Sequence, residues 1–173
     1  MNTEDLALEH GEYEIIEKHG TRLLLFKSGK VYRWSKCGYW KFIPNTKNLN
    51  SGYNLIGVGQ KENNNLKLYL RHRLLAYAFL NLDINDTKSQ IDHIDGDRLN
   101  NNINNLRIVN CQQNHFNRTT AKGYYITPNN KYKAQIGTNY KTIKLGIYDT
   151  EEEARQAYLN AKIIYHPIVN VNL

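Results

Sequence analysis

The chain has 173 residues, which allows one ordinary domain or two small ones. It carries 23 Lys and Arg against 16 Asp and Glu, and this formal net charge of +7 suits a polyanionic partner. No apolar run approaches the ~18 residues of a membrane-spanning helix, and the acidic N-terminus lacks the basic and apolar regions of a signal peptide. We therefore expect an intracellular protein with no membrane partner. Cys37 and Cys111 form no CxxC pair, so any metal must be bound mainly by oxygen or imidazole.

Residues 1–70 are rich in β-forming residues, in short runs separated by Gly, Asn and Lys. This pattern predicts a small antiparallel sheet. Residues 72–80 then group apolar residues at helical spacing, which predicts a short helix packed on that sheet. For five aromatic residues we favour a place in the core of the sheet over stacking on bases. They are Tyr32, Trp34, Tyr39, Trp40 and Phe42.

Residues 81–120 are unusually rich in Asn. The pattern predicts a strand at 91–94, a second strand at 106–109 and a short helix at 111–118 with Asn110 as its N-cap. Asp-Gly at 95–96 favours a tight turn between the strands.

Residues 121–173 have the clearest periodicity. Segments 122–127, 131–138 and 141–148 alternate with period two and predict three antiparallel strands. Thr150 and Glu153 match a capping box, and the apolar residues that follow predict an amphipathic helix. We predict an α+β protein in which an N-terminal antiparallel sheet leads into a strand–loop–strand–helix unit. A three-stranded antiparallel sheet packed on one helix follows.

The strongest functional signal is the set Asp92, His93, Asn105 and Asn114. If the two strands and the helix converge, Asp92 and Asn114 offer two oxygens to one hard divalent cation. A neutral imidazole at His93 is suited to act as a general base, and one metal with one base is sufficient to hydrolyse a phosphodiester. An ordinary acidic turn is the alternative. An EF-hand is excluded, because Asn102 stands where that loop needs a bidentate Glu.

The run IDHIDGDRLNNNINNLRIVNCQQNHFNR resembles the HNH nuclease motif, the ββα-metal fold of phage and intron-encoded homing endonucleases. With its strand–helix lead-in, the resemblance covers residues 50–118. It implies that Asp92 is a metal ligand, that His93 is the general base and that Asn105 bridges the motif's loop to hold the histidine. It also implies that Asn114 is the second metal ligand.

Two other histidines near this motif have open roles. His115 lies beside Asn114 and is the alternative ligand, although the family's spacing favours Asn114. Two roles are possible for His72, namely a structural role at the start of the helix or a contact with the scissile phosphate. With two protein oxygens, the site implies one Mg²⁺ per active site, with Mn²⁺ as a substitute.

Between Lys122 and Tyr148 there are five lysines and no Asp or Glu. Period-two alternation separates a face that packs on the helix, with Ile143 and Leu145, from a basic outer face. A basic strand surface can enter the DNA major groove, whereas a solvated lysine face is the alternative. The candidate DNA-binding residues on this outer face are Lys122, Tyr125, Thr127, Lys133, Gln135, Thr142 and Lys144.

Residues 121–165 resemble the AP2 DNA-binding domain in their GxY start, the run LGIYDTEEEA and the alanine-rich helix that follows. The resemblance implies that the three-stranded sheet reads DNA. Plant members carry Arg and Trp at several reading positions where this chain has smaller or uncharged residues. Fewer bidentate contacts to guanine imply a different base preference.

Together these patterns predict two domains. Residues 1–120 are an HNH nuclease domain with a β-rich lead-in, and residues 121–173 are an AP2-like DNA-binding domain. We expect a metal-dependent HNH homing endonuclease, encoded by a phage or mobile element, that acts as a monomer with no protein partner. It would hydrolyse double-stranded DNA to 5′-phosphate and 3′-hydroxyl ends. The alternative is a non-catalytic, sequence-specific DNA-binding protein that uses the HNH unit as a scaffold.

Overall fold

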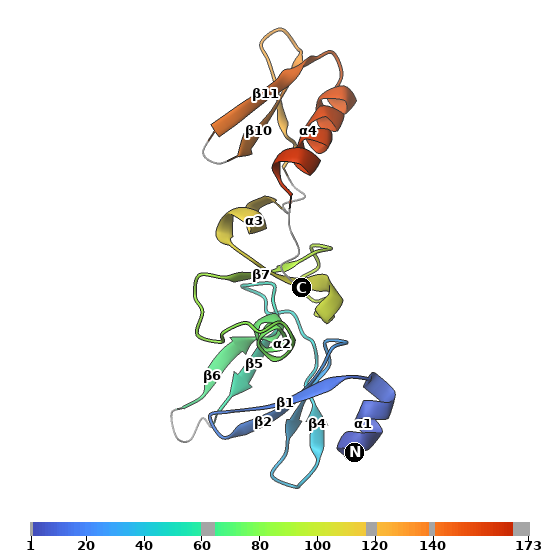
Figure 1. Ribbon diagram of the computed structural model, residues 1–173, viewed down its shortest axis with the longest axis vertical. Helices are drawn as coiled ribbons and strands as arrows, with labels where there is room; N and C mark the ends of the chain where they lie inside the picture. The colour runs from blue at the N-terminus through green and yellow to red at the C-terminus, as the bar shows by residue number, and fades with distance from the viewer. Residues whose placement is uncertain (1, 60–64, 117–120, 139–140, 168–173) are drawn as a thin grey trace. The chain divides into compact units, whose positions relative to one another are not determined.

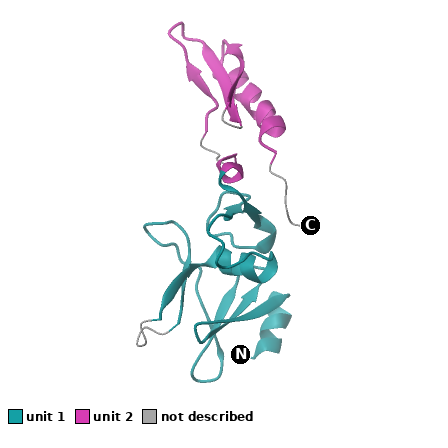
Figure 2. Ribbon diagram, turned by 60° about the vertical axis from the view of Figure 1, so that its left-hand side comes forward, with its two compact units in different colours: residues 1–111, 170–173 teal, residues 112–169 magenta. Residues whose placement is uncertain are grey.

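The computed structural model describes residues 2–59, 65–116, 121–138 and 141–167 (Figure 1). The chain divides into two units, Met1–Cys111 and Gln112–Val169, drawn in different colours in Figure 2. This division falls at the start of a short helix, ahead of the predicted boundary at 120. Residue 120 itself lies outside the described residues, and the predicted functional domains stay a prediction.

A four-stranded antiparallel sheet forms the N-terminal part of the first unit, and its strands lie side by side in the order in which they follow along the chain. Its second strand is buried on both faces, because alternate side chains enter two different cores. Leu23 and Leu25 join the core that contains Leu74, whereas Leu24 and Phe26 pack on the other face. The strands are β1 (Tyr13–Lys18), β2 (Thr21–Phe26), β3 (Val31–Trp34) and β4 (Trp40–Phe42).

A helix that the sequence analysis did not predict, α1 (Thr3–His10), covers this second face through Leu6. It begins with a capping box, in which Asn2 accepts from the Asp5 amide at 2.8 Å. Tyr32 and Trp40 are buried in the same core, as predicted for the aromatic group. The other three aromatic residues are exposed, which is contrary to that prediction, because they lie at the ends of β3 and β4 and in the turn between them rather than in the middle of the sheet. They are Trp34, Tyr39 and Phe42.

The rest of the first unit follows the predicted order of two strands, a helix and two further strands. The helix packs its apolar residues Leu74, Leu75 and Ala76 into the core shared with the sheet. One short 3₁₀ helix was not predicted. The elements are β5 (Leu55–Val58), β6 (Lys67–Leu70), α2 (Arg71–Phe79), β7 (Gln90–His93), η1 (Ile103–Asn105) and β8 (Leu106–Val109).

The first residue of α2, Arg71, is fully buried at the junction of helix and sheet. Its guanidinium donates four hydrogen bonds of 2.7–3.0 Å. All four acceptors are neutral oxygens, and none is a carboxylate. Burial lowers the pKa of Arg71 to about 10, so the group stays charged at neutral pH. The acceptors are the Asn54 side chain and the backbone carbonyls of Gly29, Ile43 and Pro44.

The second unit contains a short helix, then a three-stranded antiparallel sheet packed on one longer helix. Ile136 of the sheet packs against Tyr158 and Ala161 of the long helix, and the predicted capping box of Thr150 and Glu153 is present. These elements confirm the predicted α+β class. They are α3 (Cys111–Phe116), β9 (Tyr124–Ile126), β10 (Tyr132–Thr138), β11 (Lys141–Tyr148) and α4 (Glu151–Tyr165).

None of the helices in the described residues is both long and apolar enough to cross a membrane.

Arg71→Met should lower the free energy of unfolding of the first unit by about 3–5 kcal/mol, because it leaves several buried oxygens without a donor. Both tryptophans, Trp34 and Trp40, lie in this unit, so their fluorescence during chemical denaturation reports on it alone. The control is Arg98→Met, which removes an exposed arginine that donates to the Ser51 carbonyl at 2.9 Å. Equal shifts in the two variants would contradict the role of Arg71.

Candidate functional site

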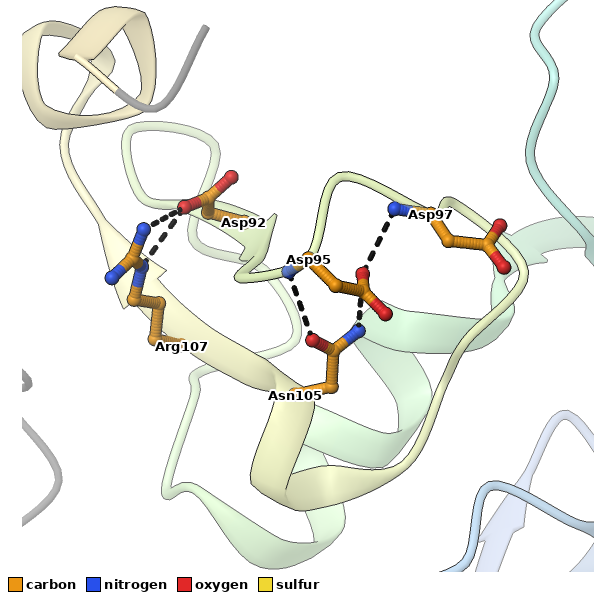
Figure 3. A network of polar contacts seen from close by, with 5 residues as sticks. All are labelled: Asp92, Asp95, Asp97, Asn105 and Arg107. Carbon is orange, nitrogen blue, oxygen red and sulfur yellow. Dashed lines mark hydrogen bonds and ion pairs between the residues drawn. The ribbon is translucent and has the colours of Figure 1, made fainter. Parts of the chain in front are cut away.

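Asp92 lies on β7 directly opposite Arg107 on β8. Nε and Nη2 of Arg107 both donate to Asp92 Oδ2, at 2.9 and 2.6 Å, and both residues are 7% exposed (Figure 3). A buried carboxylate is costly without a partner, and the guanidinium supplies one. Asp92 stands out in the sequence, but Arg107 was not predicted as a site residue, because their pairing follows from the register of the two strands.

His93, the next residue, is 4% exposed, and its Nε2 lies 3.3 Å from Oδ1 of Asn101. Asn101 in turn donates through Nδ2 to Asn45 Oδ1 at 3.2 Å and to the Leu99 carbonyl at 3.1 Å. These two acceptors fix the orientation of the Asn101 amide, so its oxygen faces the imidazole. An amide oxygen only accepts, and Nε2 of His93 therefore carries the hydrogen while Nδ1 keeps its lone pair.

The electrostatic surroundings keep this imidazole neutral. Burial lowers the pKa of His93 below its ordinary value of 6.5, and it outweighs the opposing effects of the Asn101 hydrogen bond and the nearby aspartates. A neutral imidazole at pH 7 is the form that can accept a proton.

His72 on α2 packs edge-on against His93, with ring centroids 5.1 Å apart, and against Tyr53 at 4.9 Å. Burial lowers the pKa of His72 to about 3, with smaller contributions from His93 and Arg73. His72 is itself buried. This placement agrees with a structural role for His72, as a neutral ring that shields one side of His93 from water.

Asn105 ties down the loop between the two strands (Figure 3). Its Oδ1 accepts from the Asp95 amide at 3.1 Å, and its Nδ2 donates to Asp95 Oδ1 at 2.9 Å and to the Asn100 carbonyl at 2.8 Å. Burial tends to raise the pKa of Asp95, but the hydrogen bonds from Asn100 and Asn105 outweigh it and lower this pKa. Asn101 lies in the same loop. The bridging role that the resemblance implies for Asn105 is therefore consistent with its contacts.

Asn114, the second predicted metal ligand, is half-buried in α3 and belongs to the second unit, whereas its neighbour His115 is exposed. Its pairing with Asp92 stays a prediction. In the residues that the structure describes, no three His, Cys, Asp or Glu side chains are grouped as a metal site. One carboxylate and one amide oxygen fit a hard cation that keeps most of its water, as Mg²⁺ does.

The outer face of the second unit's sheet gathers most of the predicted DNA-binding residues. Tyr125 pairs with Lys133, whose Nζ lies 5.7 Å from the centre of the Tyr125 ring, and Gln135 pairs with Lys144. Thr142 continues this face opposite Gly137, and Lys122 is exposed just before β9.

Thr127 has a different environment from the rest of the predicted set. Its hydroxyl donates to the Lys131 carbonyl at 3.0 Å and accepts from the Lys131 amide at 3.2 Å. Thr127 thus closes the turn between β9 and β10, and a contact with DNA stays a prediction.

One segment of the chain matches a known protein family. Residues 69–116 match the family model described as HNH endonuclease. An uncharacterized HNH endonuclease of Acanthamoeba polyphaga mimivirus is 42% identical over 71 residues, which are 39% of this chain and 38% of that protein.

A solved structure that concerns DNA binding and cleavage by the HNH homing endonuclease I-HmuI is also similar. It is 28% identical, with a TM-score of 0.49, over 61% of this chain and 56% of that one. The chain thus spans little more than a third of the viral relative and about half of the solved one.

The family match ends at residue 116, so the AP2-like resemblance of the second unit stays a prediction. The HNH resemblance is supported, since the matched segment contains all four residues singled out from the sequence. Residues 69–116 carry the sequence pattern of an HNH endonuclease, with Asp92, His93, Asn105 and Asn114 inside it.

Proposed function

We propose that this chain is an HNH-type endonuclease of the homing kind that hydrolyses phosphodiester bonds in duplex DNA with a divalent cation. The observation that carries the proposal is His93. Its imidazole is buried and neutral, and its Nε2 hydrogen is directed to Asn101. The match of the surrounding segment to HNH endonucleases supports a nuclease that acts on DNA.

In this proposal Nδ1 of His93 takes the proton from the water that attacks the phosphorus. Asn101 holds the ring in the required tautomer, and Asn105 holds the loop that carries Asn101. Asp92 and Asn114 are the proposed ligands of a single Mg²⁺, for which Mn²⁺ substitutes. When bound, such a cation would supply positive charge to the 3′-oxygen. Because the 3′-oxygen is the proposed leaving group, the products would carry 5′-phosphate and 3′-hydroxyl ends.

The second unit is proposed to position the protein on DNA through its basic sheet, as its resemblance to AP2 domains implies. Five lysines and no acidic residue between 122 and 148 favour a polyanionic partner. A monomer would carry one active site and therefore nick one strand. The viral relative is consistent with an origin in a phage or mobile element and with action inside a host cell.

A non-catalytic DNA-binding protein is the second candidate, and one observation favours it. Arg107 occupies Oδ2 of Asp92 with two hydrogen bonds, which is also the arrangement expected of a purely structural ion pair. Nicking of a supercoiled plasmid in Mg²⁺, and its loss in EDTA, separates the two candidates.

His93→Ala should lower the rate of plasmid nicking by about 10²–10⁴-fold, because it removes the imidazole that is proposed to accept the proton from water. DNA binding, measured by fluorescence anisotropy in EDTA, should be unchanged. Tryptophan fluorescence verifies that the variant is folded. The matched control, His19→Ala, removes an exposed histidine that contacts Tyr69 and should cleave normally. Normal cleavage by His93→Ala would refute the assignment of the base.

Lys133→Ala combined with Lys144→Ala should weaken DNA binding at every sequence tested. It should also reduce the slope of log K against log [salt] by about 2, since each lost phosphate contact releases about one counterion fewer. The control is Lys131→Ala, because Lys131 is already ion-paired with Asp149. A slope that is the same in the double variant and the parent would remove the sheet from the DNA interface.

A further inference from the structure

The third strand of the basic sheet contains a β-bulge. Gln135 pairs with Lys144, but the preceding residue, Ala134, pairs with Gly146, so Leu145 is an extra residue on β11. Gly146 has φ = +145°, and a Cβ there would come within 2.9 Å of the Tyr148 hydroxyl. This hydroxyl donates to the Leu145 carbonyl at 3.0 Å. The bulge therefore requires glycine at this position.

The bulge changes which side of the sheet the following residue faces. Ile143 and Leu145 pack toward α4, and uninterrupted alternation would place Ile147 on the same side. Because of the extra residue, Ile147 instead pairs with Lys133 of the outer face and is 62% exposed. It was absent from the DNA-binding set predicted from the sequence for this reason.

Ile147 completes a row across all three strands. Tyr125, Lys133 and Ile147 are successive cross-strand partners on β9, β10 and β11. Lys133 extends over the Tyr125 ring, which places the lysine charge toward β9, away from Ile147. At the other end of the row, the sheet presents an aliphatic side chain on a face otherwise rich in charge and hydrogen-bonding groups.

We propose that Ile147 reads DNA sequence by contacting the C5-methyl group of a thymine in the major groove. The inference rests on the proposed function, in which this face binds duplex DNA. The lysines of the sheet select the polyanion, and the thymine methyl is the one apolar group that base edges present in the major groove. Ile147 therefore makes the protein prefer an A·T pair at the position it meets, whereas the lysines hold the backbone without regard to sequence.

The test removes single methyl groups from the DNA. The full chain is kept in EDTA so that binding is measured without cleavage, and a preferred site is selected from random duplex. Each thymine of that site is then replaced in turn by deoxyuridine. At one position the replacement should weaken binding by about fourfold, the factor for burying one methyl group. The same replacement should have no effect on DNA binding by Ile147→Ser, because serine has no methyl group to place against the thymine methyl. An exposed strand position tolerates this substitution.

Ile126→Ser is the matched control. Ile126 is 61% exposed on β9, but it pairs with Tyr132, which belongs to the opposite face. This variant should keep the full sensitivity to deoxyuridine. Equal sensitivity in the parent and in Ile147→Ser, or no sensitivity of the parent at any thymine, would overturn the inference.

The failure of the proposed targeting by the sheet gives a different result. If the double lysine variant binds DNA as the parent does, the sheet is not the DNA interface. Targeting by the sheet and the role of Ile147 then both fall, while plasmid nicking still tests the nuclease. If the lysines matter but the methyl groups do not, targeting by the sheet stands and only the role of Ile147 is rejected.

Discussion

A guanidinium buried without a carboxylate holds the first unit together. Arg71 joins the start of α2 to the turn after β2, to the segment after β4 and to Asn54, which precedes β5. Because all four of these acceptors are neutral, the charge is stabilised by several amide and carbonyl dipoles rather than by one carboxylate. The next residue is His72, so the same bonds that fix the helix also set the ring that packs against His93. The position of the candidate base thus depends on contacts made far from it in sequence.

Asparagine accounts for the rest of the site's geometry. The amide of Asn105 closes the loop that begins at Asp95, and Asn101 at the end of that loop contacts His93. An amide both donates and accepts without a net charge, and it can therefore orient an imidazole while leaving the ring neutral. A carboxylate in the place of Asn101 would attract a proton to the ring and raise the pKa of His93. Two asparagines of the asparagine-rich segment thus have a physical role in this loop.

Periodicity and capping patterns predicted most of the elements, because both are local properties of the chain. The same signal is present at α1, where Asn2 and Asp5 form a capping box, although this helix was not predicted. The roles of Arg107 and Asn101 could not be predicted. They depend on the register of β7 with β8 and on the path of a loop, and neither is encoded in the spacing of residue types. Asp92 and His93 stood out because adjacent residues of these types are chemically distinctive, whatever the register.

On strand β11 of the basic sheet, the alternation of residues stops predicting which side chains face outward after the bulge. Up to Lys144, odd and even positions of β11 separate correctly into inner and outer residues, and Gly146 then shifts the count by one. A glycine inside a strand pattern is a known sign of a bulge, so the shift had a signal in the sequence. The sequence does not show which residue of the bulge is left unpaired, because this depends on the pairing with the neighbouring strand. One glycine therefore determines whether Ile147 adds to the core against α4 or to the surface that is proposed to face DNA.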